Sequence, residues 1–118
     1  MELVAFLGKD KENLGQITAL INKGEWEKIL LLKNKDTPNI QTTKQYKTLT
    51  INNSLPLFEL KEEMKEKLSS SLAKEFEVAL SLASGTGKEH MALISALLSV
   101  PVGIKIVAFT KKGIEFLT

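Results

Sequence analysis

The segment Ser84-Gly85-Thr86-Gly87-Lys88 places two glycines, two hydroxyls and a lysine between two apolar runs. Glycine lets the backbone approach an anion closely, and hydroxyls, a lysine and the unpaired N–H groups of a helix start all donate to phosphate. A second segment, Gly8-Lys9-Asp10, follows the first apolar run and also combines glycine with lysine. Both segments are candidate phosphate-binding loops, and Ser84 and Lys88 are the candidate catalytic residues.

A structural turn would have the same composition. Ser84 or Thr86 could cap the following helix while the glycines form a sharp turn, so binding and capping remain open alternatives. The segment is not a Walker A loop, because Leu82 stands where that motif needs glycine and Glu89 where it needs serine or threonine. The dinucleotide fingerprint is rejected as well, because its glycines belong after the first strand.

Six segments of the chain have the composition of β-strands. Most are continuous apolar runs, which are typical of parallel strands covered on both faces. They occupy residues 2–7, 29–32, 46–51, 78–83, 104–109 and 114–117. The last two are joined by the short polar segment 110–113, which predicts an antiparallel hairpin.

Three further segments show apolar residues at helical spacing. The first ends at Gly24, a helix stop signal. The second begins at Pro56 and its apolar positions step by four as far as Phe76, and the third covers residues 88–99. Residues 34–44 are polar and contain a proline, so we expect a loop there.

The order of these elements predicts an α/β fold. Strands and helices alternate as β-α-β-β-α-β-α-β-β, which favours right-handed parallel crossovers. We expect a three-layer Rossmann-like sandwich whose mostly parallel sheet of about six strands ends in an antiparallel β-hairpin. The length of 118 residues suits one domain, residues 1–118.

The two glycine–lysine segments follow the first and fourth strands of this fold. In a Rossmann-like sheet the strand order reverses between those strands, and their loops diverge to leave a crevice for a ligand. The candidate ligand-binding residues are therefore Gly8, Lys9, Asp10, Ser84, Gly85, Thr86, Gly87 and Lys88.

Composition excludes several classes of site. The chain has no cysteine and one histidine, so thiol nucleophiles are excluded and neither a metal site nor a cofactor is expected. All sixteen basic residues are lysine, and without arginine we expect no recognition of duplex DNA. The chain lacks both a run long enough to cross a membrane and a signal peptide, so we expect a cytoplasmic protein with no membrane partner.

The segment after the fourth strand resembles the CRISPR-associated Rossmann fold (CARF) family, whose motif there is approximately Thr/Ser-Gly-Gly-Thr-Lys followed soon by methionine or another apolar residue. The residues that match are Ser84, Gly85, Lys88 and Met91. Thr86 and Gly87 stand in exchanged order, and the loop 34–44 replaces the helix that CARF proteins usually have between the second and third strands. CARF proteins usually carry an effector domain after the sensor, so the resemblance implies an isolated sensor or a fragment of a longer system.

The resemblance also implies a function in CRISPR-type antiviral defence. It suggests a homodimer that holds a small RNA-like phosphate ligand, a cyclic oligoadenylate, across paired loops. Three functions stay open: a second-messenger sensor, a metal-independent ring nuclease that cleaves the same ligand, and a non-catalytic interaction domain. A face of small residues on the last helix suits either close packing on the sheet or contact with a second subunit; it consists of Ala92, Ser95, Ala96 and Ser99.

Overall fold

The computed structural model describes residues 1–72 and 76–118, and its sheet is the predicted one. Strands β1 to β5 are mutually parallel, and β6 pairs antiparallel with β5 in the C-terminal hairpin. The spatial order is β3-β2-β1-β4-β5-β6, so the order reverses between β1 and β4. The strands are β1 (Glu2–Leu7), β2 (Lys28–Asn34), β3 (Lys47–Ile51), β4 (Glu77–Ser81), β5 (Gly103–Thr110) and β6 (Gly113–Phe116).

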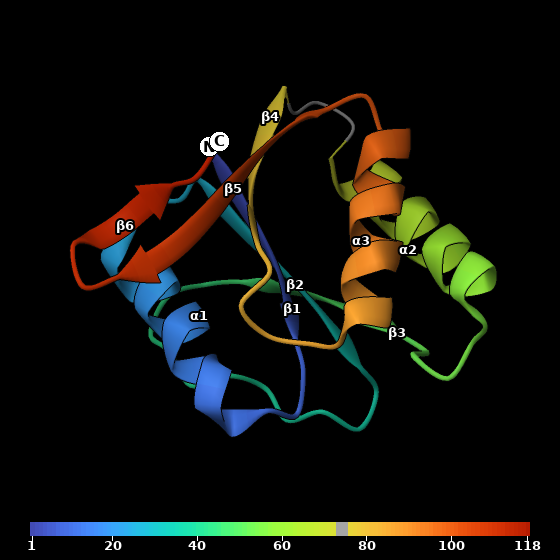
Figure 1. The fold of residues 1–118 in the computed structure, drawn as a ribbon, viewed down its shortest axis with the longest axis horizontal. Helices are drawn as coiled ribbons and strands as arrows, with labels where there is room; N and C mark the ends of the chain where they lie inside the picture. The colour runs from blue at the N-terminus through green and yellow to red at the C-terminus, as the bar shows by residue number, and fades with distance from the viewer. Residues whose placement is uncertain (73–75) are drawn as a thin grey trace.

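Helices cover both faces of the sheet and make the fold a three-layer sandwich. Helix α1 (Lys11–Lys23) lies on one face, and helices α2 (Leu57–Ser71) and α3 (Gly87–Ser99) lie side by side on the other (Figure 1). β1 is buried along its whole length because its side chains alternate between these two layers. None of the described helices is long and apolar enough to cross a lipid bilayer.

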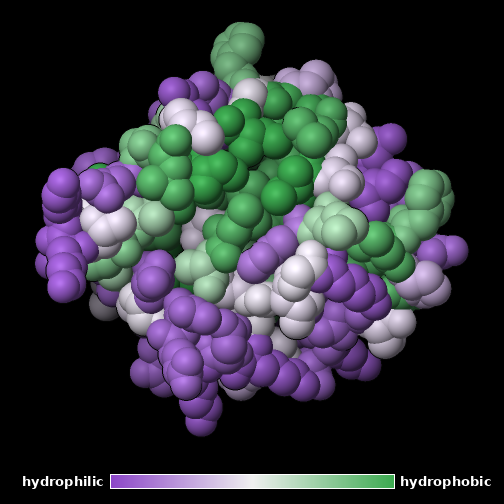
Figure 2. All heavy atoms as spheres, in the orientation of Figure 1, coloured by the Kyte–Doolittle hydropathy of each residue, from purple (hydrophilic) through white to green (hydrophobic). Residues whose placement is uncertain are grey.

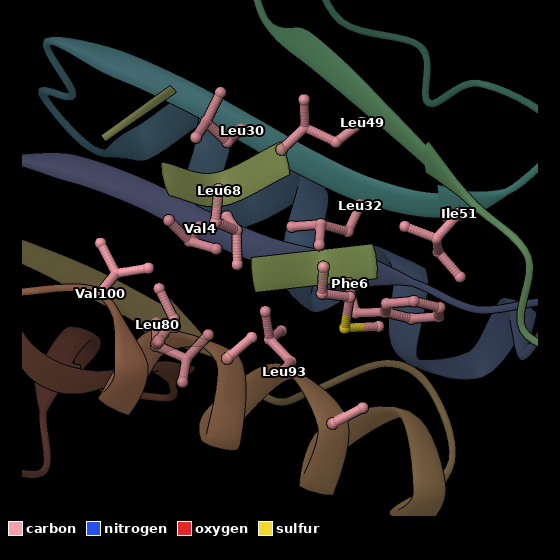
Figure 3. Packing of buried hydrophobic residues seen from close by; sticks show 14 of the residues in the cluster. Val4, Phe6, Leu30, Leu32, Leu49, Ile51, Leu68, Leu80, Leu93 and Val100 are labelled. Carbon is pink, nitrogen blue, oxygen red and sulfur yellow. The ribbon is translucent and has the colours of Figure 1, made fainter. Parts of the chain in front are cut away.

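The larger apolar layer lies between the sheet and the α2–α3 pair. Figure 3 shows side chains from the sheet, among them Phe6 and Leu32, pointing toward Leu68 of α2 and Leu93 of α3. All four of these side chains are essentially inaccessible to solvent. This layer holds α3 firmly against the sheet, so the loop before α3 is anchored at both ends.

Most predicted element ends differ by one or two residues from the observed ones, and β4 and α2 end at least two residues earlier than predicted. β4 stops at Ser81 rather than at Ala83, because the chain turns away from the sheet there and Ser84 Oγ instead accepts a hydrogen bond from the Gly8 N–H. α2 stops at Ser71, where the backbone of Leu72 departs from helical geometry. Phe76 therefore does not continue the buried face of α2, and its side chain is 93% exposed. Residues 73–75 of the predicted helix lie outside the described residues.

Gly24 ends α1 as predicted, but for a reason other than left-handed backbone. Its φ of −89° is open to any residue. A Cβ atom at this position would lie 2.3 Å from Nε1 of Trp26, which donates a hydrogen bond to the Leu20 carbonyl at 2.7 Å. The glycine is thus required by the space that the indole ring occupies over the last turn of the helix.

Candidate functional site

The two predicted loops lie in contact at the carboxyl edge of the sheet, because β1 and β4 are adjacent parallel strands. The Gly8 N–H donates to Ser84 Oγ at 2.9 Å. A Cβ atom on Gly8 would lie only 2.9 Å from the backbone nitrogen of Gly85, so a larger residue there would push the loops apart. Close approach of two backbones explains the glycine at position 8.

Asp10 links the two loops. One carboxylate oxygen, Oδ1, accepts from Ser84 Oγ at 2.8 Å and from the Gly85 N–H at 3.3 Å, while Oδ2 accepts from Asn13 Nδ2 at 2.7 Å. Burial raises the pKa of Asp10, but the hydrogen bonds from Asn13, Ser84 and Gly85 outweigh it and hold the pKa below its ordinary value. Asp10 is therefore ionised at neutral pH, and both of its oxygens accept from donors within the chain.

Ser84 is the second half of this link. Its side chain is inaccessible to solvent, and its hydroxyl donates to Asp10 and accepts from Gly8. Its carbonyl accepts from His90 Nε2 at 2.7 Å, which ties the loop to the first turn of α3. The Ser84 hydroxyl thus joins two loops 74 residues apart in the sequence and is not presented to a ligand in the crevice.

The start of α3 is closed by a capping box. Thr86 Oγ1 accepts from the Glu89 N–H at 3.2 Å, and Glu89 Oε1 accepts from the Thr86 N–H at 2.8 Å. The capping alternative is therefore confirmed for Thr86. Within the described chain, the N–H groups of Gly87 and Lys88 donate no hydrogen bond in this first turn, and they remain for an anion.

Two lysines stand at the margins of the site. Lys9 Nζ forms an ion pair with Asp36 Oδ2 at 2.8 Å, and both side chains are largely exposed. Lys88 is exposed on the opposite side, where its Nζ donates to the Asn53 carbonyl at 3.1 Å. Because each contact is exposed and easily exchanged for another acceptor, both lysines are free to turn toward a bound phosphate.

A crevice of about 300 Å³ lies at the two loops, and Gly8, Lys9, Asp10, Gly85 and Thr86 are among the residues that line it. Ser84, Gly87 and Lys88 do not belong to this lining. The walls of the crevice include two residues that sequence reasoning missed: Thr37, which follows β2, and Asn53, which follows β3. Asn53 Nδ2 donates to Glu89 Oε2 at 3.1 Å, so it also braces the capping box. The signal that could have found both residues is their position after parallel strands, since all such loops meet at one edge of the sheet.

The arrangement combines a rigid frame with adjustable charges. The frame consists of the hydrogen-bonded loops, and the adjustable groups are Lys9, Lys88 and two backbone N–H groups. It can attract and orient a phosphate group, but the Ser84 hydroxyl, which contacts both loops, is already engaged. Searches of family models, of curated proteins and of solved structures find no match for the chain.

Proposed function

We propose that the protein is a binding module for a small RNA-like phosphate ligand and that it senses a cyclic oligoadenylate in CRISPR-type antiviral defence. The observation that carries this proposal is the crevice at the point where the strand order reverses, walled by two loops that Asp10 and Ser84 lock together. Loops that are already ordered lose little conformational freedom when a ligand binds. The resemblance of the β4 loop to the CARF motif supports a cyclic oligoadenylate as that ligand.

The geometry favours a sensor over a ring nuclease. A nuclease of this kind needs groups that stabilise charge as it develops on the phosphate. Ser84 is buried and committed to Asp10, so the two lysines and the N–H groups at the start of α3 are the groups left for that task. A lack of ligand binding would favour the third function, a non-catalytic interaction domain.

Calorimetry tests the proposed function directly. Cyclic tetra-adenylate or cyclic hexa-adenylate is expected to bind with measurable heat, and a DNA duplex of similar phosphate content is expected not to bind. The reason is that lysine and backbone N–H groups attract phosphate, whereas reading a duplex depends mainly on arginine, which the chain lacks. If neither cyclic ligand gave heat of binding, the sensor function would be contradicted. Tight binding of the duplex would contradict the inference that a chain without arginine does not recognise duplex DNA.

We also propose that the protein forms a homodimer, through a surface that differs from the predicted one. Ala92 and Ala96 of the small-residue face are buried in the chain's own core, so close packing explains them. Figure 2 shows a continuous hydrophobic area on one face of the molecule. Ile104 and Ile106 of β5, which pack against the core layer beneath α2 and α3, are only half-buried, and Leu98 of α3 is 73% exposed. Contiguous apolar surface of this kind is characteristic of protein–protein interfaces.

Light scattering tests the homodimer. At micromolar concentration the wild type is expected to have about twice the chain mass of 13.1 kDa. Leu98→Glu should return it to the mass of one chain, because a buried unpaired carboxylate would oppose association. Phe58→Glu on α2 is the matched control, since Phe58 is 66% exposed but belongs to a different helix from Leu98. A monomeric wild type, or the same mass for both variants, would contradict the proposed surface.

A further inference from the structure

A second cavity adjoins the crevice and has a different character. It has a volume of about 460 Å³ and lies between the first turns of α1 and the loop after β2. Its apolar wall is formed by Leu7, Leu14, Pro38 and Ile40. Both hollows are lined in part by Leu7, Gly8, Lys9 and Thr37. The apolar cavity is therefore adjacent to the crevice that would hold the phosphate.

The wall of this cavity is preformed. Leu7 is fully buried at its base, and Leu14 and Ile40 pack against the core layer under α1. The Ile40 carbonyl accepts from the Tyr46 hydroxyl at 3.0 Å, which fixes one end of the loop.

The other end of the loop is fixed by Lys33. This lysine is 9% exposed, and its Nζ donates to the Thr37 carbonyl at 2.6 Å. The Thr37 N–H in turn donates to the Asn34 carbonyl at 3.1 Å. A hollow with such supported walls can bind a ligand without first being ordered.

The chemistry of the cavity indicates the kind of group that fits it. The apolar wall suits the faces of a flat ring, while the side chains of Thr37 and Asn39, which also line the cavity, offer hydrogen-bonding groups to the edge of that ring. Lys9 and Lys11 give the mouth positive charge, and Asp36 compensates only one of them. An apolar slot beside cations matches a planar base joined to a phosphate, whereas an acyl chain would use neither the polar rim nor both lysines.

We propose that this cavity is the subsite for the nucleobase of a ligand whose phosphate lies in the adjoining crevice. The inference deepens the proposed function and rests on it. It assigns the base to Leu14, Pro38 and Ile40, which belong to neither of the predicted phosphate-binding loops. It also gives the loop after β2 a role in recognising the ligand.

Methyl-detected NMR of the wild-type protein provides the first test. Adenosine 5′-monophosphate is expected to shift the methyl signals of Leu14 and Ile40 at millimolar concentration. Ribose 5-phosphate, which has the phosphate and sugar but no base, should leave those signals in place. Equal shifts from both compounds, or no shift from adenosine 5′-monophosphate, would overturn the subsite. Shifts from dodecanoate alone would overturn it in favour of an acyl-chain pocket.

A pair of variants provides the second test. Leu14→Trp places a large ring in the cavity and is expected to weaken binding of cyclic tetra-adenylate or adenosine 5′-monophosphate about tenfold or more, which corresponds to about 1.4 kcal/mol. Leu57→Trp is the matched control, because Leu57 is an exposed leucine at the start of α2, away from the cavity. Thermal unfolding of both variants establishes that they are folded.

The outcomes separate the subsite from the proposed function. If a folded Leu14→Trp variant bound cyclic tetra-adenylate with unchanged affinity, the subsite would be overturned and the proposed sensor function would not be affected. Binding of adenosine 5′-monophosphate at Leu14 and Ile40 without any binding of a cyclic oligoadenylate would overturn the sensor and support the subsite. Equal weakening by Leu14→Trp and Leu57→Trp would also overturn the subsite, because the effect would then not depend on the cavity.

Discussion

Replacement of Gly85 by alanine is expected to lower the free energy of unfolding by about 2–4 kcal/mol, through backbone strain and overpacking combined. Gly85 has a φ of 108°, a conformation that residues with a side chain rarely adopt. A Cβ atom there would also lie 2.9 Å from Cδ1 of Phe6, which is locked in the core. If the backbone rotated to a negative φ, or shifted to relieve the contact with Phe6, the Gly85 N–H would move away from Asp10 and the link between the loops would loosen.

Urea denaturation of Gly85→Ala beside Gly87→Ala measures this effect. Gly87 is the matched control, because a Cβ atom at that position meets nothing within 4 Å and its φ is not positive. Gly87→Ala is expected to change stability by less than about 1 kcal/mol, in the stabilising direction, since alanine restricts the unfolded chain. Equal stabilities of the two variants would show that the loop tolerates a side chain at position 85.

Lys88→Ala is expected to separate a sensor from a nuclease. Lys88 is exposed and its Nζ contacts only the Asn53 carbonyl in the described chain, so its loss should leave the fold intact. In a sensor the lysine supplies attraction to phosphate, so affinity for cyclic oligoadenylate should fall by about 1.5–3 kcal/mol while the ligand stays intact. In a nuclease the lysine would stabilise charge in the transition state, so the cleavage rate should fall much more than the affinity.

The measurement is incubation of labelled cyclic oligoadenylate with each protein in EDTA, followed by separation of linear products. Lys67→Ala is the matched control, because Lys67 also donates to a backbone carbonyl, that of Thr50, but lies in α2 and belongs to neither candidate loop. We expect no product from the wild type and weaker binding by Lys88→Ala alone. Product that disappears only in Lys88→Ala would favour the nuclease. Equal affinity and equal slow cleavage in all three proteins would contradict any role of Lys88.

The elements of the fold could be predicted because they depend on local pattern. The run from Glu2 to Leu7 is buried on both faces in the structure, as a continuous apolar strand must be. The apolar positions Leu60, Met64 and Leu68 of α2 all lie in one core layer, as their spacing by four predicts. The strand order then followed from general rules of α/β folds, which also placed the two glycine–lysine loops side by side.

The roles of individual polar groups could be predicted only in part. Both capping and phosphate binding were consistent with the composition of residues 84–88, and the structure shows Thr86 in a capping box with Glu89. The hydrogen bond from Ser84 to Asp10 could not be predicted from the sequence of either loop, because each loop contains ordinary turn residues. The small-residue face of α3 likewise fitted two alternatives, and close packing accounts for Ala92 and Ala96, which are buried, but not for Ser99, which is exposed.

By itself, the sequence determined which segments are strands and helices, their order, and the edge of the sheet where the two glycine–lysine loops meet. Those properties arise from hydrophobic periodicity and from the handedness of crossovers, which act over short stretches of chain. Only the tertiary structure decided that Ser84 joins two loops, that Thr37 and Asn53 wall the crevice, and that an apolar cavity adjoins it. The physical reason is that hydrogen-bond partners and cavities depend on which distant side chains the packed core brings within a few ångströms.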